Sequence, residues 1–332
     1  MVDATPPELS ADAPPQPETK PRNKLFTAIK IAASIGLIAW IVSTANLADV
    51  FAALKQVDVR WLLFAVALQF VGAGILSFRW KGLLDVQGVS PGWGYLYKST
   101  LVANFFRQFL PSIIGGDVIR GHDAWKAGAT WPVALMSLLL DRLLGLLALA
   151  LLAMVAVLFS DELSAKLPSL RWWLIAAFVG LSVVLSFLLL PRRAGSTPRT
   201  WPSLIPGKIA AKLSSIGEAM TMYQGKPQAL WRGLGLSVFL QINVVTFYWA
   251  LSQALGLEID YGSWFVIAPI AIFVMMIPLS INGIGVREAI FIFLLSQWDV
   301  TNSTALALAW LEYGIFLAFG LVGGLVYMLR KT

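Results

Sequence analysis

The sequence contains no cysteine and a single histidine among 332 residues. Disulfides and thiolate nucleophiles are therefore excluded, and Cys/His metal sites have almost no ligands from which to form. Charge is also scarce, because Asp, Glu, Lys and Arg together make up only 13% of the chain. We expect no metal and no other cofactor, so function must rest on a few charged side chains and on backbone groups.

Apolar residues are abundant instead. They form 58% of the chain, and the mean hydropathy is +0.75, far above that of a soluble domain of this length. The sequence therefore predicts an all-α polytopic membrane protein. The net charge of +7 does not predict nucleic-acid binding, because Lys and Arg cluster between apolar runs, where they set topology and contact anionic lipids at the cytoplasmic face.

The chain divides into a tail and a membrane domain. Residues 1–22 combine prolines and acids without apolar periodicity, which predicts a disordered cytoplasmic tail before a domain at 23–332. Within that domain, halves at about 23–190 and 229–332 are joined by a basic linker, 191–228, predicted to be cytoplasmic. The linker sequence is equally compatible with an interfacial amphipathic helix and with an ordinary basic loop.

A membrane span needs about 20 apolar residues, and six uninterrupted runs qualify: 25–44, 61–78, 132–158, 172–190, 230–255 and 304–329. Two further apolar segments, 92–122 and 262–298, are interrupted. The bias of Lys and Arg, with Arg79 counted after the second span and Arg330 after the last, places both termini in the cytoplasm. The chain could have six spans plus two re-entrant segments, or it could have eight spans. Both topologies give this orientation, and the sequence does not distinguish them.

The two interrupted segments resemble each other. FLPSIIGGDVIRGHDA, residues 109–124, and MIPLSINGIGVREA, residues 276–289, each place an arginine nine positions after a proline, as Pro111 with Arg120 and Pro278 with Arg287. Three clear spans lie between them, so the second copy enters the membrane inverted. This layout predicts an inverted repeat of re-entrant helices around a polar cavity, and two ordinary helices kinked by Pro and Gly are the alternative.

Two acids lie inside apolar runs. Asp141 follows Trp131 by ten residues and is about 15 Å deep, and Glu312 has a similar position in the last run. Such charges face a cavity or a partner. We expect Asp141 to pair with Arg120 or, second, with Arg107; a purely structural staple is the alternative. For the amides Asn104, Gln241, Asn243 and Asn282, interhelical hydrogen bonding is favoured over ligand contact for any single one.

The stretches RQFLPSIIGGDVIR at 107–120, DRLLG at 141–145 and IPLSINGIGVREA at 277–289 resemble the signature stretches of the lysylphosphatidylglycerol synthase transmembrane-region family. The resemblance covers most of the chain after residue 22 and implies a lipid flippase with re-entrant segments. Family members with two parts continue into a soluble aminoacyl-transferase domain. This sequence stops at Thr332, so the resemblance implies no synthase and no particular substrate.

Carried over by motif, the resemblance implies residues that line or shape a lipid path. Those expected to bind substrate are Arg107, Arg120, Arg142, Arg287 and Asn282. Those expected to line the cavity or couple transport, with Glu312 added from its depth, are Asp117, Asp141, Glu288 and Glu312. Those expected to shape the broken helices are Pro111, Gly115, Gly116, Pro278, Gly283 and Gly285.

We therefore expect a transporter rather than an enzyme: a translocase of the bacterial inner membrane for an anionic phospholipid, an aminoacyl-phospholipid or a polyprenyl-phosphate-linked glycolipid. Its partner would be a lipid with a phosphate headgroup, because guanidinium groups bind phosphate bidentately. The alternative is a membrane-embedded transferase acting on a polyprenyl-linked sugar. The specific lipid, the direction, proton coupling against uncoupled scrambling, and assembly into a homo-oligomer stay open.

Overall fold

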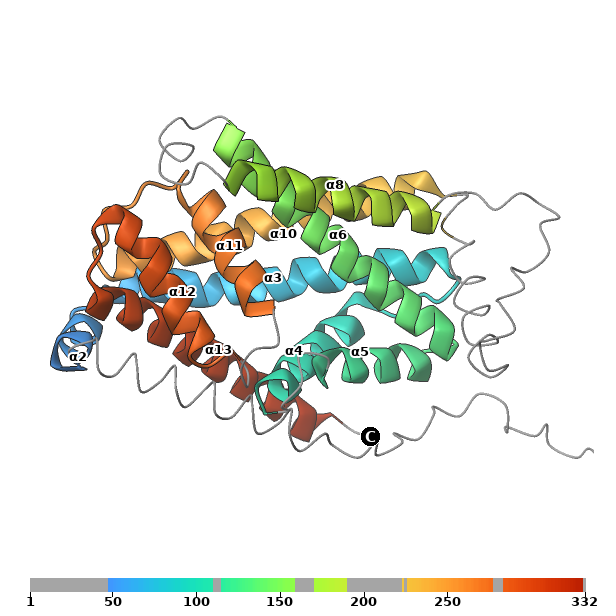
Figure 1. The fold of residues 1–332 in the computed structure, drawn as a ribbon. Coiled ribbons are helices and arrows are strands. Elements are labelled where there is room, and N and C mark those ends of the chain that lie inside the picture. The colour runs from blue at the N-terminus through green and yellow to red at the C-terminus, as the bar shows by residue number, and fades with distance from the viewer. Residues whose placement is uncertain are drawn as a thin grey trace, which may run out of the picture.

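The structure, a computed structural model, describes residues 47–109, 115–158, 170–189, 223, 226–276 and 283–330. Every regular element in these ranges is a helix (Figure 1). In chain order they are α2 (Leu47–Lys55), α3 (Val59–Val86), α4 (Trp93–Phe109), α5 (Gly115–Lys126), α6 (Trp131–Leu158), α8 (Leu170–Leu189), α10 (Pro227–Ala254), α11 (Trp264–Met276), α12 (Val286–Leu295), the short 3-10 helix η1 (Ser296–Trp298) and α13 (Asn302–Leu329). The predicted tail, the first predicted span and most of the linker lie outside the described residues.

Four of the described helices, α3, α6, α10 and α13, are long and apolar enough to cross a membrane. Each has 28 residues, which corresponds to about 42 Å and exceeds the ~30 Å thickness of a bilayer core. The predicted runs 132–158, 230–255 and 304–329 agree with α6, α10 and α13 to within a few residues. α8 matches the run 172–190, although its apolar stretch, 172–186, is shorter. The protein is thus a multi-pass membrane protein.

The helix that contains the second predicted span is longer than the apolar run. The run 61–78 was ended before Arg79 because a charge there signals the membrane surface, yet α3 continues to Val86 and buries Arg79, which is 3% exposed. The charge is tolerated inside the bundle because a carboxylate from another helix neutralises it, as described below. Arg79 is therefore a charge that the bundle buries and neutralises, and it is not solvated.

Each interrupted segment forms two helices. The first contains α4 and α5 on either side of residues 110–114, and the second contains α11 and α12 on either side of residues 277–282; these intervening residues lie outside the described part. Figure 1 shows α4 and α5 toward the end of the bundle where α3 ends and α6 begins, and α11 and α12 toward the other end. The total number of spans and the inverted repeat remain predictions.

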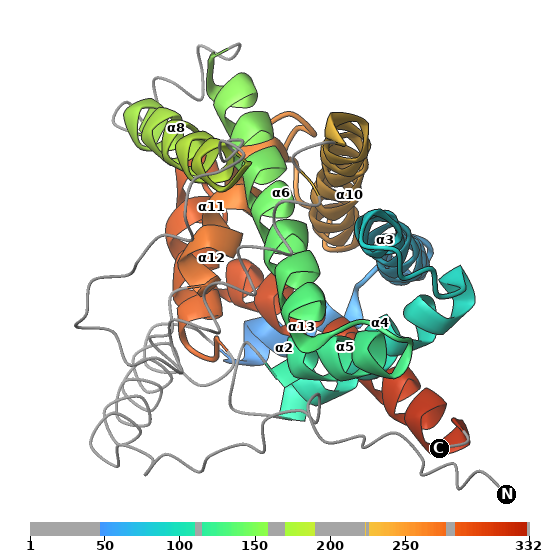
Figure 2. The same ribbon diagram turned by 90° about the vertical axis from the view of Figure 1, so that its right-hand side faces the viewer.

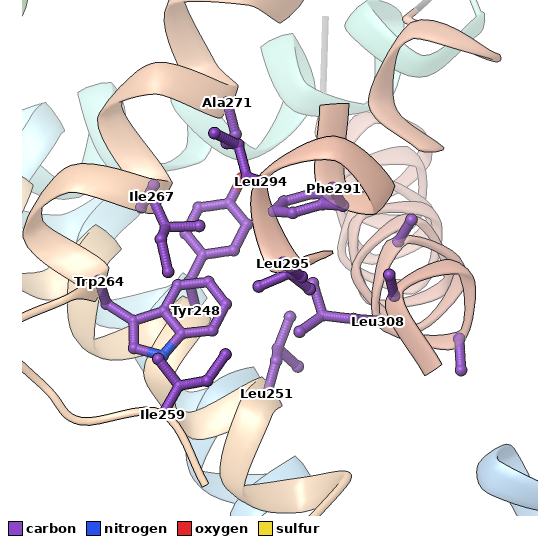
Figure 3. Packing of buried hydrophobic residues seen from close by; sticks show 14 of the residues in the cluster. Tyr248, Leu251, Ile259, Trp264, Ile267, Ala271, Phe291, Leu294, Leu295 and Leu308 are labelled. Carbon is purple, nitrogen blue, oxygen red and sulfur yellow. The ribbon is translucent and has the colours of Figure 1, made fainter. Parts of the chain in front are cut away.

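Aromatic and aliphatic side chains of α10, α11, α12 and α13 form the largest core (Figure 3). The Tyr248 ring lies parallel to Trp264, with ring centroids 6.2 Å apart, and is tilted against Phe291 at 5.7 Å. On the outside, large apolar side chains such as Trp231 and Met328 are exposed. An apolar exterior around a packed interior is what lipid as solvent favours, so the long helices are apolar on most faces.

Helix starts and close helix contacts fix the arrangement. The Asp58 carboxylate accepts a hydrogen bond from the Arg60 backbone at 2.8 Å and caps α3, and Thr301 caps α13 in the same way. α3 packs along α10, and the two lie side by side when the molecule is viewed along them (Figure 2). α13 packs along α4, where a Cβ atom on Gly323 would lie only 2.0 Å from the Leu101 carbonyl oxygen.

Candidate functional site

A buried ion cluster joins α3, α5, α6 and α10 around Asp141. The Asp141 carboxylate accepts a hydrogen bond from Arg79 Nε at 2.7 Å and another from Arg120 Nη2 at 3.1 Å. Arg79 Nη1 also donates to Ser237 Oγ at 2.7 Å. The predicted contact between Arg120 and Asp141 is confirmed, and the second candidate, Arg107, is not the partner. Two arginines on one carboxylate leave excess positive charge here.

Asp117 supplies a second carboxylate to this cluster. Its Oδ1 lies 3.6 Å from Arg120 Nη1, and its Oδ2 pairs with Arg142. The Arg120 guanidinium also lies over the Trp80 ring, 4.3 Å from the centroid. Both carboxylates therefore hold arginines in place. Among the described residues, and counting Arg79, three arginines face two acids, and Arg120 contacts both acids.

The second half has a smaller counterpart, formed by Arg287 of α12 and Glu312 of α13. Arg287 Nε lies 3.5 Å from Glu312 Oε2, and the Tyr248 hydroxyl donates to Glu312 Oε1 at 2.7 Å. Among the described residues, no hydrogen-bond partner is found for Arg287 Nε, Arg287 Nη1 or Glu312 Oε2, although all three atoms are buried. Buried polar atoms without partners are costly, which makes this pair a candidate for ligand binding.

The turn before α12 requires glycine. Gly283 and Gly285 have φ angles of +76° and +85°, a region that side chains with a Cβ rarely occupy. The Gly285 backbone N–H donates to Glu288 Oε2 at 2.7 Å, so Glu288 caps the helix rather than facing the cavity. Gly116, which the sequence aligns with Gly283, instead lies inside α5, where a Cβ atom would be 2.6 Å from the Ala103 carbonyl oxygen. The aligned glycines thus have different local roles.

A cavity of about 400 Å³ lies between the two interrupted segments. Arg107 from α4 and Arg287 from α12 both line it, together with Glu312. Four amide side chains add hydrogen-bonding groups to its wall: Gln69, Asn104, Gln241 and Asn243. Phe247, Ile272, Phe316 and several other apolar residues form the rest of the lining. This volume and this mixture of apolar walls with a few polar groups are typical of a small-ligand site.

The amides in this wall are only partly occupied by protein contacts. Asn104 Nδ2 donates to the Thr100 carbonyl at 3.1 Å in its own helix, and Gln241 Nε2 donates to the Gly145 carbonyl at 3.0 Å. The second bond joins two helices, as the sequence favoured, yet both side chains also face the cavity. Among the described residues, no carboxylate lies within ion-pairing distance of Arg107, which lines the cavity without a direct ion pair.

Of the predicted site residues, Arg107, Arg287 and Glu312 meet at the cavity, whereas Asp117, Arg120, Asp141 and Arg142 form the separate ion cluster. Gly115 is buried at the start of α5. Pro111, Pro278 and Asn282 lie outside the described residues. The sequence did not indicate site roles for Arg79, Gln69 and Tyr248. Of these three, Arg79 had the clearest sequence signal, because its charge directly follows an apolar run.

No group of three or more histidine, aspartate or glutamate side chains is arranged to hold a metal within the part of the chain that the structure describes. Long apolar helices, interrupted segments and a polar cavity between them define a polytopic membrane protein with a polar interior.

The chain belongs to the lysylphosphatidylglycerol synthase TM region family, whose model matches residues 27–324. It is also similar to a UPF0104 membrane protein of Methanothermobacter thermautotrophicus, with 25% identity over 306 residues that cover 84% of this chain and 88% of the relative. The family assigns a lipid-related membrane function in general terms.

Proposed function

We propose that this protein is a lipid translocase that moves a phosphate-bearing headgroup across the membrane through the cavity between the interrupted segments. The observation that carries the proposal is that Arg107 and Arg287, one from each segment, line the same cavity. A phosphate in a low-dielectric interior needs a positive group where water cannot solvate it. Arginine suits this task because its planar fork binds two phosphate oxygens at once.

The unpaired polar atoms at the cavity support the same function. Arg287 keeps Nε and Nη1 without hydrogen-bond partners among the described residues, and Arg107 has no ion-pair partner there. A bound headgroup would satisfy these donors, and the cavity amides would contact its polar remainder. The apolar lining and the surrounding bilayer would hold the acyl or isoprenoid tails while the headgroup crosses.

The finer features of the proposal follow from charge and topology. The substrate would be an anionic phospholipid, an aminoacyl-phospholipid or a polyprenyl-phosphate-linked glycolipid, and the protein would act as a transporter rather than as an enzyme. Its location would be a bacterial inner membrane with both termini in the cytoplasm, an orientation that survives the removal of Arg79 from the surface charges. The inverted repeat would let the two segments serve opposite sides of the membrane.

The test is headgroup translocation in proteoliposomes, compared between the full chain and its Arg107→Gln and Arg287→Gln variants. Losing one charged hydrogen-bonding group should slow transport by roughly ten- to a hundredfold. Arg107→Lys should keep part of the rate, because it retains charge but not the bidentate fork. Arg60→Gln, at an exposed position, is the matched control for charge.

Arg107→Gln is the sharper variant, because no described ion pair is broken and the folded protein should keep its stability. Wild-type transport by both Gln variants would end the proposal. A membrane transferase would give a different result: chemically altered lipid would accumulate, and no intact headgroup would appear on the far side. Mass spectrometry of the lipids after the assay distinguishes these two functions.

A further inference from the structure

A second hollow, of about 310 Å³, lies between α3 and α10 and shares no lining residue with the cavity. It is called the basic groove here, and it is lined by Phe78, Arg79, Lys81, Gly82, Asp85, Val86, Lys226, Ala229, Arg232, Gly233 and Leu236. Along α3 the groove residues come after the cavity residues, and along α10 they come before them. The groove therefore lies at the end of the pair where α3 ends and α10 begins. The sequence places this end of the pair in the cytoplasm.

Positive charge dominates the groove. Lys81, Lys226 and Arg232 surround it, whereas Asp85 is the one acid among the described residues that line it. Asp85 is already engaged, because Lys81 Nζ lies 2.8 Å from both of its carboxylate oxygens. Arg79 lines the buried side of the groove, with its own charge balanced by Asp141. The remaining excess comes from Lys226 and Arg232, which both lie on exposed parts of α10 or directly before it.

Hydrogen bonds fix the polar residues around the groove. Ala229, Arg232, Gly233 and Leu236 line it along one side of the first turns of α10. Lys226 Nζ donates to the Val86 carbonyl at 3.2 Å, so its ammonium is held at the end of α3 rather than directed into solvent. The Tyr223 hydroxyl donates to the Leu83 carbonyl at 2.9 Å and ties the residues before α10 to the same place. Burial raises the pKa of Tyr223 above its ordinary value, so this donor stays neutral.

Glycine makes the room in the groove, and apolar residues flank it. A Cβ atom on Gly82 would meet nothing within 4 Å, so open space lies directly over that position. Phe78, which is 47% exposed, and Leu236 flank the hollow with apolar surface. A charged end beside an apolar flank matches a lipid whose headgroup is anionic and whose tails run along the outside of the helices.

We propose that the basic groove is a distinct binding site for the phosphate headgroup of an anionic glycerophospholipid. Lys226 and Arg232 would contact the phosphate, Gly82 would provide space for the headgroup, and Phe78 and Leu236 would contact the upper part of the tails. The proposal concerns binding at this groove and does not depend on transport through the cavity.

The test uses the full chain in phosphatidylcholine nanodiscs that contain phosphatidylglycerol carrying a photoreactive group next to the headgroup. After illumination, mass spectrometry maps the cross-linked residues. Labelling should appear within residues 78–86 and 229–236, and unlabelled phosphatidylglycerol should displace it whereas added phosphatidylcholine should not. Arg107→Gln, which alters the cavity alone, should leave groove labelling unchanged, so failure of the transport proposal and failure of this one are distinguishable.

Two variants test the groove itself. Gly82→Leu should fill the open space and retain the fold, because a Cβ atom at this position meets nothing within 4 Å and leucine favours a helix more than glycine does. The double variant Lys226→Gln with Arg232→Gln removes the excess charge. Each should lower groove labelling by at least roughly tenfold. The double variant loses two charged contacts with the phosphate, and the leucine side chain occupies the space of the headgroup.

The control for Gly82→Leu is Gly180→Leu, where a Cβ atom also meets nothing within 4 Å. The control for the double charge variant is Lys55→Gln with Arg60→Gln, which removes the same charge at exposed positions outside the groove. Both controls should label as the wild type does. Unchanged groove labelling in the two groove variants would overturn the proposal. Displacement by inorganic phosphate as effective as that by phosphatidylglycerol would also overturn it, because the groove would then bind a soluble anion rather than a lipid.

Discussion

Arg79 Nε lies 2.7 Å from Asp141 Oδ1, and the exposed fractions of the two side chains are 3% and 2%. The two residues come from α3 and α6, so this contact joins distant parts of the chain. Neither charge is solvated. Removing Asp141 would leave Arg79 buried without a countercharge, whereas removing Arg79 would leave Asp141 with Arg120 as its remaining ion-pair partner. Several expectations about stability and function depend on this contact and on its counterpart in the second half.

Asp141→Asn should destabilise the folded protein by about 3–5 kcal/mol, because two arginines lose their carboxylate. Thermal unfolding in detergent, followed by the loss of monodisperse protein, measures the effect. Asp85→Asn, at an exposed acid, is the control and should change stability by no more than about 0.5 kcal/mol. Equal melting temperatures for the two variants would show that the cluster does not hold the bundle.

A double-mutant cycle separates the two partners of Asp141. Arg79 and Arg120 should each show a coupling energy with Asp141 of roughly 0.5–3 kcal/mol, with the larger value for Arg79, which makes the shorter contact. Arg107, which does not contact Asp141, should be additive with it. Additivity for Arg79 would contradict the structure.

Arg120→Gln and Arg287→Gln should fail in different ways. Arg120 contacts two carboxylates and the Trp80 ring, so its loss should mainly lower the yield of folded protein. Arg287 contacts Glu312 but lines the cavity, so its loss should mainly lower transport at matched thermal stability. Wild-type yield for Arg120→Gln together with defective transport would instead favour a direct role for Arg120 in binding.

Gly323→Ala should destabilise the contact between α13 and α4 by about 1–3 kcal/mol, because the new Cβ would overlap the Leu101 carbonyl. Gly314→Ala in the same helix is the control, since its Cβ meets nothing within 4 Å. The control should be neutral or slightly stabilising, because alanine favours a helix more than glycine does. Chemical or thermal unfolding of both variants gives the comparison.

Topology is testable because the chain has no cysteine of its own. Single cysteines at Lys126 and Glu258, both exposed, should react with impermeant thiol reagents from opposite sides of the membrane. Lys126→Cys should be protected in intact cells and Glu258→Cys labelled. Labelling of both from one side would reject an odd number of spans between the interrupted segments, and with it the inversion of the second segment.

Sequence reasoning located α6, α10 and α13 closely because uninterrupted apolar runs are long enough to define a span on their own. It ended α3 too early for a physical reason: whether Arg79 marks the membrane surface depends on Asp141 and Ser237, which lie on other helices. It also did not anticipate α2, a short helix outside the long apolar runs.

The site was predicted in part for the same reason. The depth of Asp141 required a partner, and Arg120 was the correct first choice. Arg107 faces the cavity, whereas Arg120 is enclosed by carboxylates. This difference depends on how α4 and α5 are rotated against their neighbours, and a motif alone does not specify that rotation. The amide of Gln69 lies in an ordinary apolar run and carries no local signal of its role.

The glycine contacts also limit how the cavity can change shape. Gly323 presses α13 against α4, and Gly72 presses α3 against Asn243 of α10, where a Cβ atom would lie 2.8 Å from the amide oxygen. The first contact is a close approach of two helix backbones, and the second is a close approach of the Gly72 backbone to an amide side chain. Arg107 of α4 and Glu312 of α13 therefore belong to one closely packed pair of helices, and the amides of α3 and α10 belong to another. Under the proposed function, access to the cavity from either side would alternate through rocking between these pairs or through displacement of α11 and α12.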